Sequence, residues 1–160
     1  MRNKLFFMLA LPFVLAACSK STPPETCTYT TTTAVAPAAE RAALRASLDT
    51  SFIQDPSGIC YKIITQGTGA VPEVCSDVTV KYSGRITSSD IPFDKNETGV
   101  TFKLGGLIPG WQIGIPLIQK GGSIILYIPP SLGYGSTGAG NGAIPPGSYL
   151  VFTIDLLNVQ

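Results

Sequence analysis

Hydrophobic and polar residues alternate along several segments of the chain after about residue 58. In one of them Val78, Val80 and Tyr82 fall on the same face of an extended strand. Alternation with a period of two is typical of strands that are buried on one side. Five such segments, each bounded by Gly, Pro, Asn or Ser, cover residues 58–65, 76–87, 99–104, 123–129 and 148–159. They predict an antiparallel sheet with one buried face.

One helical pattern interrupts these strands. Pro109 suits the first position of a helix, and Trp111, Ile115 and Ile118 repeat on one helical face. Pro116 removes a backbone donor, so the helix must be short. A single short helix can cover the concave face of a curved five-stranded sheet. The pattern therefore predicts an α+β domain of about 110 residues.

Composition excludes several functional classes. Charged residues make up 13% of the chain and the formal net charge is +1, which leaves no electrostatic field to hold a nucleic acid. Histidine is absent, so a histidine general base and metal sites that need imidazole are excluded. We expect no metal and no organic cofactor.

The first residues have the pattern of an export signal. Arg2 and Lys4 precede an apolar run that is too short to span a bilayer permanently. The run ends in Leu-Ala-Ala before Cys18, which resembles the bacterial lipobox. This predicts a signal peptide over residues 1–17, lipid attachment at Cys18 and a location in the cell envelope, facing the periplasm or the outer membrane. The alternative is an ordinary signal peptide cleaved nearby, with Cys18 incidental.

The segment after Cys18 has no regular period. Residues 18–37 are rich in Thr, Pro and Ala, and they predict a flexible linker. In residues 38–52, Leu44, Leu48 and Phe52 are spaced four apart among helix formers, which predicts a short N-terminal helix packed on a domain over residues 53–160.

An exported chain can form disulfides. Cys60 and Cys75 flank a turn-rich segment, so a bond between them would clamp two neighbouring strands. Two buried thiols are an equally favoured alternative. Three cysteines cannot all pair internally, and we expect Cys27 to be free or the odd partner.

Six motifs occur in order between about residue 58 and residue 160. They are VTVKYSGRI, FD at residues 93 and 94, TFKLG, LIPGWQIGI, LYIPPSLGYG and IPPGSYLVFTIDLL. In this order they resemble the FKBP family of peptidyl-prolyl cis-trans isomerases. The fold of that family, a curved antiparallel sheet half-wrapped around a short helix, agrees with the fold that the residue pattern predicts.

The resemblance implies an apolar pocket that holds a proline ring. Trp111 would form its floor, and Asp94 would be its buried carboxylate. The remaining residues that match the family's pocket are Tyr82, Phe93, Leu107, Ile108 and Phe152 in the walls, and Tyr134 and Ile144 at the rim. The sequence departs from the family at Val100, where some members have an aromatic residue, and in the glycine-rich loop GSTGAGNGA. We expect Val100 to widen the pocket.

The resemblance also implies an activity that needs no nucleophile. The pocket would bind a twisted X-Pro amide, with the Ile108 N–H and the Tyr134 hydroxyl holding carbonyl groups. The implied partners are proline-containing polypeptide clients and macrolide-type inhibitors. The lipobox-like sequence adds a membrane as a partner, reached through the N-terminal lipid. The chain has no long heptad repeat, and we expect a monomer. Two alternatives keep the fold without catalysis: a chaperone or adhesion lipoprotein that binds proline segments, and a structural lipoprotein whose own side chains fill the pocket.

Overall fold

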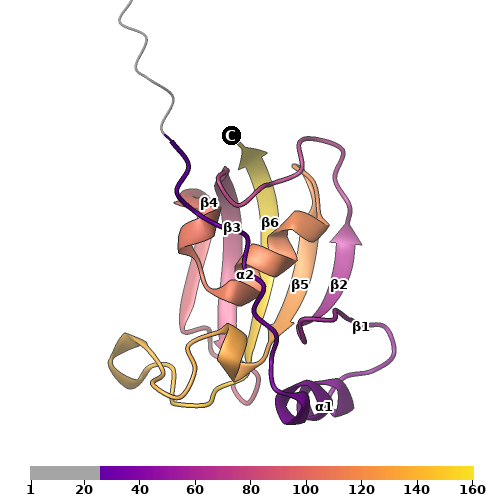
Figure 1. Cartoon of the computed structure of the whole chain (residues 1–160), viewed down its shortest axis with the longest axis vertical. Helices are drawn as coiled ribbons and strands as arrows, with labels where there is room; N and C mark the ends of the chain where they lie inside the picture. Colours follow the sequence, from indigo (N-terminus) through magenta and orange to yellow (C-terminus); the bar gives the residue numbers. More distant parts are fainter. Residues whose placement is uncertain (1–25) are drawn as a thin grey trace, which may run out of the picture.

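The computed structural model describes residues 26–160, in which a curved sheet wraps around a short helix (Figure 1). The sheet is antiparallel and has the strand order β1-β2-β5-β6-β3-β4. Its strands are β1 Ile53–Gln54, β2 Cys60–Thr65, β3 Asp77–Ile86, β4 Asp94–Lys103, β5 Ser123–Ile128 and β6 Leu150–Val159. The expected α+β class is confirmed. The five expected strands correspond to β2–β6, and the two-residue β1 adds a sixth at the edge.

The strand β4 is longer than the alternation predicts, because a bulge divides it. The pairing of β3 with β4 shifts register between Val80 and Tyr82. At this bulge the Asn96 Oδ1 accepts the backbone N–H of Thr98 at 3.1 Å and of Gly99 at 2.7 Å. The φ of Gly99 is 111°, a conformation that favours glycine. The residues before and within the bulge are mostly polar, so the first half of the strand shows no alternation of hydrophobic and polar residues.

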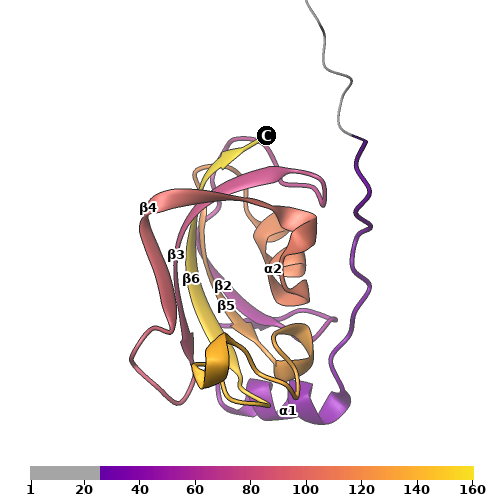
Figure 2. The same ribbon diagram turned by 90° about the vertical axis from the view of Figure 1, so that its left-hand side faces the viewer.

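The helix α2, Pro109–Gly114, lies against the concave face of the sheet (Figure 2). Gly110 and Gly114 are four residues apart and therefore share one face of this helix. A Cβ atom at Gly110 would meet the side chain of Ile128 at 2.5 to 2.8 Å, and one at Gly114 would meet the side chain of Leu126. Both glycines thus allow the helix backbone to approach β5 closely. The helix ends at Gly114, and a 3-10 turn that contains Pro116, η2 Ile115–Leu117, follows it, so the helix is short as the sequence predicts.

The core lies between α2 and the sheet. Trp111, Ile115 and Ile118 from the helical segment are all buried, as their spacing predicts. They meet the inward-facing residues of the central strands, which include Val78, Val80, Ile124, Leu126, Ile128, Leu150, Phe152, Ile154 and Leu156. This packing fixes the helix over the middle of the sheet.

The N-terminal helix is shorter than expected. The helix α1, Ala38–Ala46, ends where the Ser47 hydroxyl donates to the Leu44 carbonyl at 2.7 Å. The next residues favour local side-chain bonds over helix, as where the Asp49 Oδ1 accepts the Ser51 N–H at 2.7 Å. Leu44 is buried, so the expected packing of the helix on the domain is confirmed.

The expectation of a flexible linker is wrong for its described part, residues 26–37. These residues are extended, and Ala36 is buried and donates its N–H to the Ser57 carbonyl at 2.7 Å. Cys27 is also bonded covalently to the domain. The sequence could not show these contacts, because they join residues far apart in the chain. Residues 1–17, Cys18 and the linker before residue 26 lie outside the described residues.

The expected pairing of Cys60 with Cys75 is also wrong. The disulfide joins Cys27 to Cys75, with 5.8 Å between the Cα atoms, and Cys60 is a buried free thiol. Cys60 lies in β2, and β5 and β6 separate β2 from β3, which Cys75 precedes. The two segments are consecutive in sequence but are not neighbours in the sheet. No helix among residues 26–160 has the length and apolar character that crossing a membrane requires.

Candidate functional site

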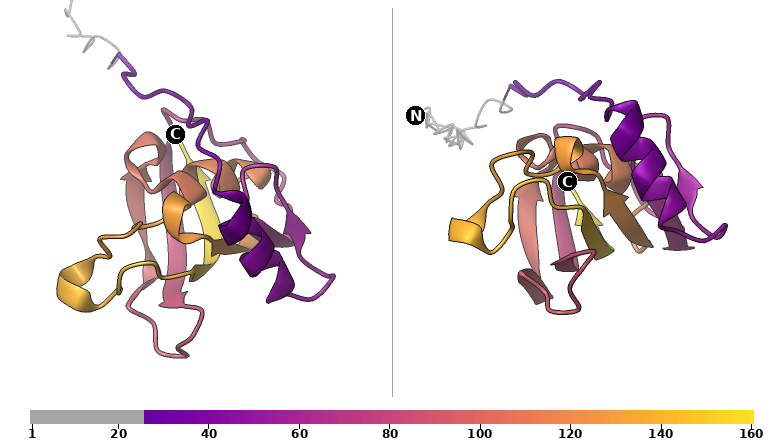
Figure 3. Two further views of the ribbon diagram at one scale, coloured as in Figure 1. Left: turned by 60° about the horizontal axis from the view of Figure 1, so that its bottom comes forward. Right: turned by 90° about the horizontal axis from the view of Figure 1, so that it is seen from below.

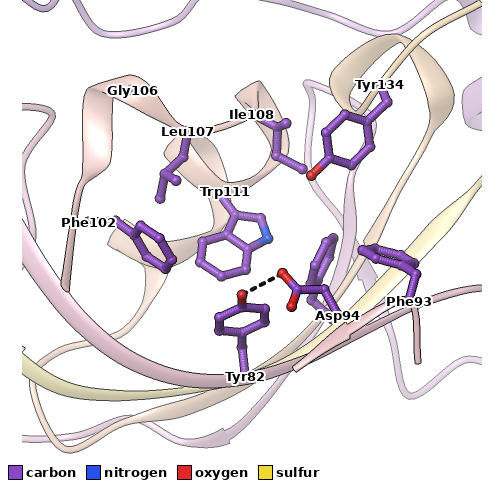
Figure 4. Close-up of a pocket in the computed structure, with 10 residues that line it drawn as sticks. Tyr82, Phe93, Asp94, Phe102, Gly106, Leu107, Ile108, Trp111 and Tyr134 are labelled. Carbon is purple, nitrogen blue, oxygen red and sulfur yellow. Dashed lines mark hydrogen bonds between the residues drawn. The ribbon is translucent and has the colours of Figure 1, made fainter. Parts of the chain in front are cut away.

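A cavity of about 330 Å³ lies between the sheet and the N-terminal end of α2 (Figure 4). The lining residues come from β3, β4, β6, η1 (Leu104–Gly106) and α2, from the positions just before β4 and α2, and from the loop after β5. They are Tyr82, Phe93, Asp94, Phe102, Gly106, Leu107, Ile108, Trp111, Tyr134 and Phe152. Eight of the nine residues that the sequence assigns to a pocket are among them. The ninth, Ile144, is not.

The floor of the cavity is a cluster of aromatic rings around Trp111, whose side chain is nearly buried. The indole meets the ring of Tyr82 edge to face, with centroids 5.3 Å apart, and that of Phe152 in the same way at 5.2 Å. Phe102 approaches the indole at 6.3 Å, and Phe93 approaches Phe152 at 5.7 Å. Edge-to-face pairs of this kind hold each ring in one orientation. The cavity therefore has a preformed apolar floor.

A glycine makes room for two of these rings. Gly84 lies in β3, and a Cβ atom there would come within 2.7 Å of the Phe152 Cδ1 and 3.0 Å of the Phe93 Cζ. Real Cβ atoms seldom approach other atoms so closely. The rings of Phe152 and Phe93 therefore pack directly against the backbone of β3.

Among residues 26–160, Asp94 is the one carboxylate that lines the cavity, and it is hydrogen-bonded to a tyrosine. The Tyr82 hydroxyl donates to the Asp94 Oδ2 at 2.6 Å. Burial and this hydrogen bond raise the pKa of Tyr82 to about 12, and burial, followed by the charge of Asp94, raises the pKa of Tyr134. Both hydroxyls are thus protonated at neutral pH. Asp94 itself is exposed, which corrects the expectation of a buried carboxylate.

Three donors at the cavity have no hydrogen-bond acceptor within residues 26–160. They are the backbone N–H of Ile108, the hydroxyl of Tyr134 and the indole Nε1–H of Trp111. Ile108 is the N-cap residue of α2, where backbone N–H groups have no partner in the helix. The indole Nε1–H is the buried one among these three donors. A buried donor without an acceptor costs about 1 to 3 kcal/mol, so a ligand that brings a carbonyl oxygen to Trp111 would be favoured. The same described residues contain no group of three His, Cys, Asp or Glu side chains suited to a metal.

Ile144 has a different place from the one expected. Its backbone pairs with Ala139 through two hydrogen bonds of 2.9 and 3.0 Å, and its side chain is buried in the core. It therefore closes the base of the glycine-rich loop without lining the cavity.

Phe102 and Gly106 also line the cavity, although the sequence motifs did not assign them to it. Phe102 lies in the TFKLG motif, two residues after Val100, and its alternation with Val100 was the available signal. Val100 pairs with Val80 and is not among the lining residues. The widening of the pocket at Val100 stays a prediction. Phe102 supplies the aromatic wall on β4.

A curved antiparallel sheet, one short helix and an aromatic cavity at the start of that helix together define the FKBP class of domain. The model of the family described as FKBP-type peptidyl-prolyl cis-trans isomerase matches residues 69–157, more than half of the chain. The chain belongs to this family.

Curated relatives agree with this assignment. The FKBP-type peptidyl-prolyl cis-trans isomerase FkpA of Escherichia coli (strain K12) is 41% identical over 107 residues, which cover 65% of this chain and 38% of FkpA. The outer membrane protein MIP of Legionella longbeachae is 38% identical over 108 residues, covering 66% of this chain and 46% of MIP. The chain thus matches less than half the length of either relative.

Solved structures show the same fold. A crystal structure of FkpA from Escherichia coli superposes with a TM-score of 0.68 at 35% identity, covering 77% of this chain and 58% of that one. A peptidyl-prolyl cis-trans isomerase from Pseudomonas syringae pv. tomato gives a TM-score of 0.69 at 32% identity, covering 76% of this chain and 91% of its own.

Proposed function

We propose that the protein is a peptidyl-prolyl cis-trans isomerase whose aromatic cavity binds X-Pro segments of polypeptides. The observation that carries this proposal is the cavity itself. It has an aromatic floor around Trp111 beside the donors of Ile108 and Tyr134, which have no acceptor among residues 26–160. A prolyl residue has a compact apolar ring, and a peptide carbonyl group lies on each side of that ring. Membership in the FKBP family supports the same reaction.

The chemistry requires rotation about one bond and no bond cleavage. Amide resonance gives this rotation a barrier of about 18 to 20 kcal/mol, and an uncatalysed X-Pro bond isomerises in tens to hundreds of seconds. A site that binds the twisted amide more tightly than either planar form lowers the barrier, by a factor of ten in rate for each 1.36 kcal/mol or so.

The residues of the cavity supply this preference in two ways. The rings around Trp111 remove water from the amide, and an apolar environment disfavours the more polar planar amide relative to the twisted one. The N–H of Ile108 and the hydroxyl of Tyr134 then hold carbonyl oxygens in the geometry of the twisted state. Asp94 fixes the Tyr82 ring through its hydrogen bond and moves no proton in the reaction.

The location we propose is the cell envelope, with the domain held at a membrane by a lipid on Cys18 and acting on exported proteins during folding. The lipobox-like sequence before Cys18 supports this location. The relative from Legionella longbeachae is named an outer membrane protein. A disulfide between Cys27 and Cys75 also fits an oxidising compartment. The clients would be proline-containing chains, bound by a monomer.

The experiment that tests the activity is the cis-trans exchange rate of a Leu-Pro tetrapeptide, followed by NMR with the full-length chain. Tyr134→Phe removes one donor but keeps the ring, and we expect it to lower kcat/KM by about tenfold. The control is Ile64→Ala, which should leave the rate unchanged. Ile64 is an exposed residue of β2 and does not line the cavity. A folded protein that binds the peptide but does not accelerate exchange would instead be a proline-binding chaperone.

A further inference from the structure

The chain before β1 forms an arm, defined here as residues 26–46, that lies outside the segment matched by the family model. Figures 1 and 2 show its extended part running past α2, on the side of the helix away from the sheet, before α1 begins. In Figure 3, α1 lies across the end of the domain near the loop that follows β5. The arm therefore passes close to two segments that contribute to the cavity.

The first contact is made by Tyr29 on the turn η1. A Cβ atom at Gly105 would lie 2.5 Å from the Tyr29 Cβ and 2.7 Å from its Cδ1, so the ring packs directly on the Gly105 backbone. A Cβ atom placed on Gly106, which lines the cavity, would lie 3.5 Å from the Tyr29 hydroxyl oxygen. The Gln112 Nε2 holds the same turn by donating to the carbonyls of Gly105 at 3.1 Å and Leu107 at 2.7 Å. Tyr29 and Gln112 together fix the wall that leads into Ile108.

The disulfide fastens Tyr29 to this wall. Cys27 lies two residues before Tyr29 and is bonded to Cys75. The residues that flank Cys75 are hydrogen-bonded to η1: the Gly105 N–H donates to the Val74 carbonyl at 2.8 Å, and the Leu104 N–H donates to the Ser76 carbonyl at 3.0 Å. The segment around Cys75 and the turn η1 are thus one connected unit, and the disulfide attaches the arm to it.

The second contact is made by Glu40 of α1. Its Oε2 accepts the backbone N–H of Ser131 at 3.0 Å and the Ser131 hydroxyl at 2.7 Å. Ser131 lies in the 3-10 turn η3, Pro130–Leu132, and Tyr134 follows two residues after that turn. Glu40 therefore holds the start of the loop that carries the Tyr134 hydroxyl.

We propose that the arm is a positioning element of the cavity: Tyr29 holds the wall that presents the Ile108 N–H, and Glu40 holds the loop that presents Tyr134. This inference rests on the proposed function, because the cavity is taken as the proline site. Neither residue lines the cavity, so both act through the turns that they contact.

The test compares alanine variants with conservative ones in the full-length chain. Tyr29→Ala removes the ring, whereas Tyr29→Phe keeps it. Glu40→Ala removes the acceptor, whereas Glu40→Gln keeps an acceptor oxygen. Val35→Ala is the matched control in the arm, because Val35 is 60% exposed. For each variant we would measure kcat and KM on the tetrapeptide, thermal unfolding, and the NMR resonance of the indole N–H of Trp111, the only tryptophan in the chain.

A positioning role predicts that both alanine variants raise KM by about fivefold, leave kcat within about twofold and shift the indole resonance. The Phe and Gln variants and Val35→Ala should match the parent protein. KM values within about twofold of the parent in both alanine variants, with an unmoved indole resonance, would overturn the inference.

Two further outcomes keep the inference separate from the proposed function. If the parent protein shows no turnover, the proposed function fails, but the indole resonance still decides whether Tyr29 and Glu40 position the cavity. If Tyr29→Ala does not fold, the double variant of Cys27→Ser with Cys75→Ser takes its place. A double variant with the parent's KM and indole resonance would contradict the role of the arm at η1.

Discussion

Replacing Gly84 by alanine tests how the aromatic floor is built. The new Cβ would lie 2.7 Å from the Phe152 Cδ1 and 3.0 Å from the Phe93 Cζ, and it would approach the Phe152 Cε1 more closely still. Ordinary carbon contacts are about 3.5 to 4.0 Å, so both rings must move by several tenths of an ångström or more. Phe152 cannot move freely, because its ring already meets the indole of Trp111 at 5.2 Å.

Overpacking of this kind typically costs about 1 to 3 kcal/mol of unfolding free energy. We expect Gly84→Ala to lose that amount in urea unfolding followed by Trp111 fluorescence. The displaced rings also line the cavity, so we expect kcat/KM for the tetrapeptide to fall by about tenfold or more at temperatures where the variant remains folded.

Ser83→Ala is the matched control, because it makes a similar change one residue earlier in β3 on the opposite face of the sheet. It should keep its activity and lose less than about 0.5 kcal/mol of stability. A Gly84→Ala protein with full activity and the stability of the control would refute the close packing of Phe152 and Phe93 on β3.

Four more predictions concern Tyr82, the pH profile of the reaction, the disulfide and Gly110. The pKa of Tyr82 is raised from 10.0 to about 12, so the fold favours the protonated hydroxyl. This contribution to stability is complete below pH 10 and is lost as the pH rises through 12. Urea unfolding should therefore show a decline in the free energy of unfolding between pH 10 and 12, and Tyr82→Phe should reduce that decline. With no histidine in the chain, kcat/KM should be flat between about pH 6 and 9, and a bell-shaped profile in that range would show a titrating group that the cavity does not contain. The double variant of Cys27→Ser with Cys75→Ser should lose about 2 to 4 kcal/mol in chemical denaturation, because the bond closes a loop with a sequence separation of 48, and an unchanged midpoint would contradict this. Gly110→Ala should lower the melting temperature measured by calorimetry, because its Cβ would lie 2.5 Å from the Ile128 Cγ2 and push α2 away from β5. An unchanged melting temperature would show that the Ile128 side chain can move aside.

Alternation and helix signals in the sequence were sufficient for the central part of the fold. Val78, Val80 and Tyr82 have the period of a half-buried strand, and Pro109 and Pro116 bracket the short helix, so these elements follow from local chemistry. The first half of β4 does not follow, because its bulge depends on the side chain of Asn96 and on pairing with β3. The two-residue strand β1 is too short to carry a period.

The disulfide shows why contacts between distant segments were harder to predict. Cys60 and Cys75 are closer in sequence than Cys27 and Cys75, which made their pairing attractive. The order of strands in the sheet determines which cysteines can pair. The sequence alone does not show that β5 and β6 lie between β2 and β3.

The cavity was predicted through resemblance to a family, and the resemblance transferred whole motifs better than single side chains. Trp111, Tyr82 and Asp94 lie together as their motifs imply. Ile144 belongs to a loop whose base is closed by pairing with Ala139, and that pairing turns its side chain into the core. Tyr29 and Glu40 lie before the matched segment, so no motif pointed to them.

The most direct test of the account is the cis-trans exchange rate of a Leu-Pro tetrapeptide in the presence of the full-length chain, compared with the same protein carrying Tyr134→Phe. The account predicts clear acceleration by the parent protein, about tenfold weaker acceleration by the variant, and identical melting curves for the two. A folded parent protein that leaves the exchange rate at its uncatalysed value would contradict the assignment of the cavity as a catalytic proline site.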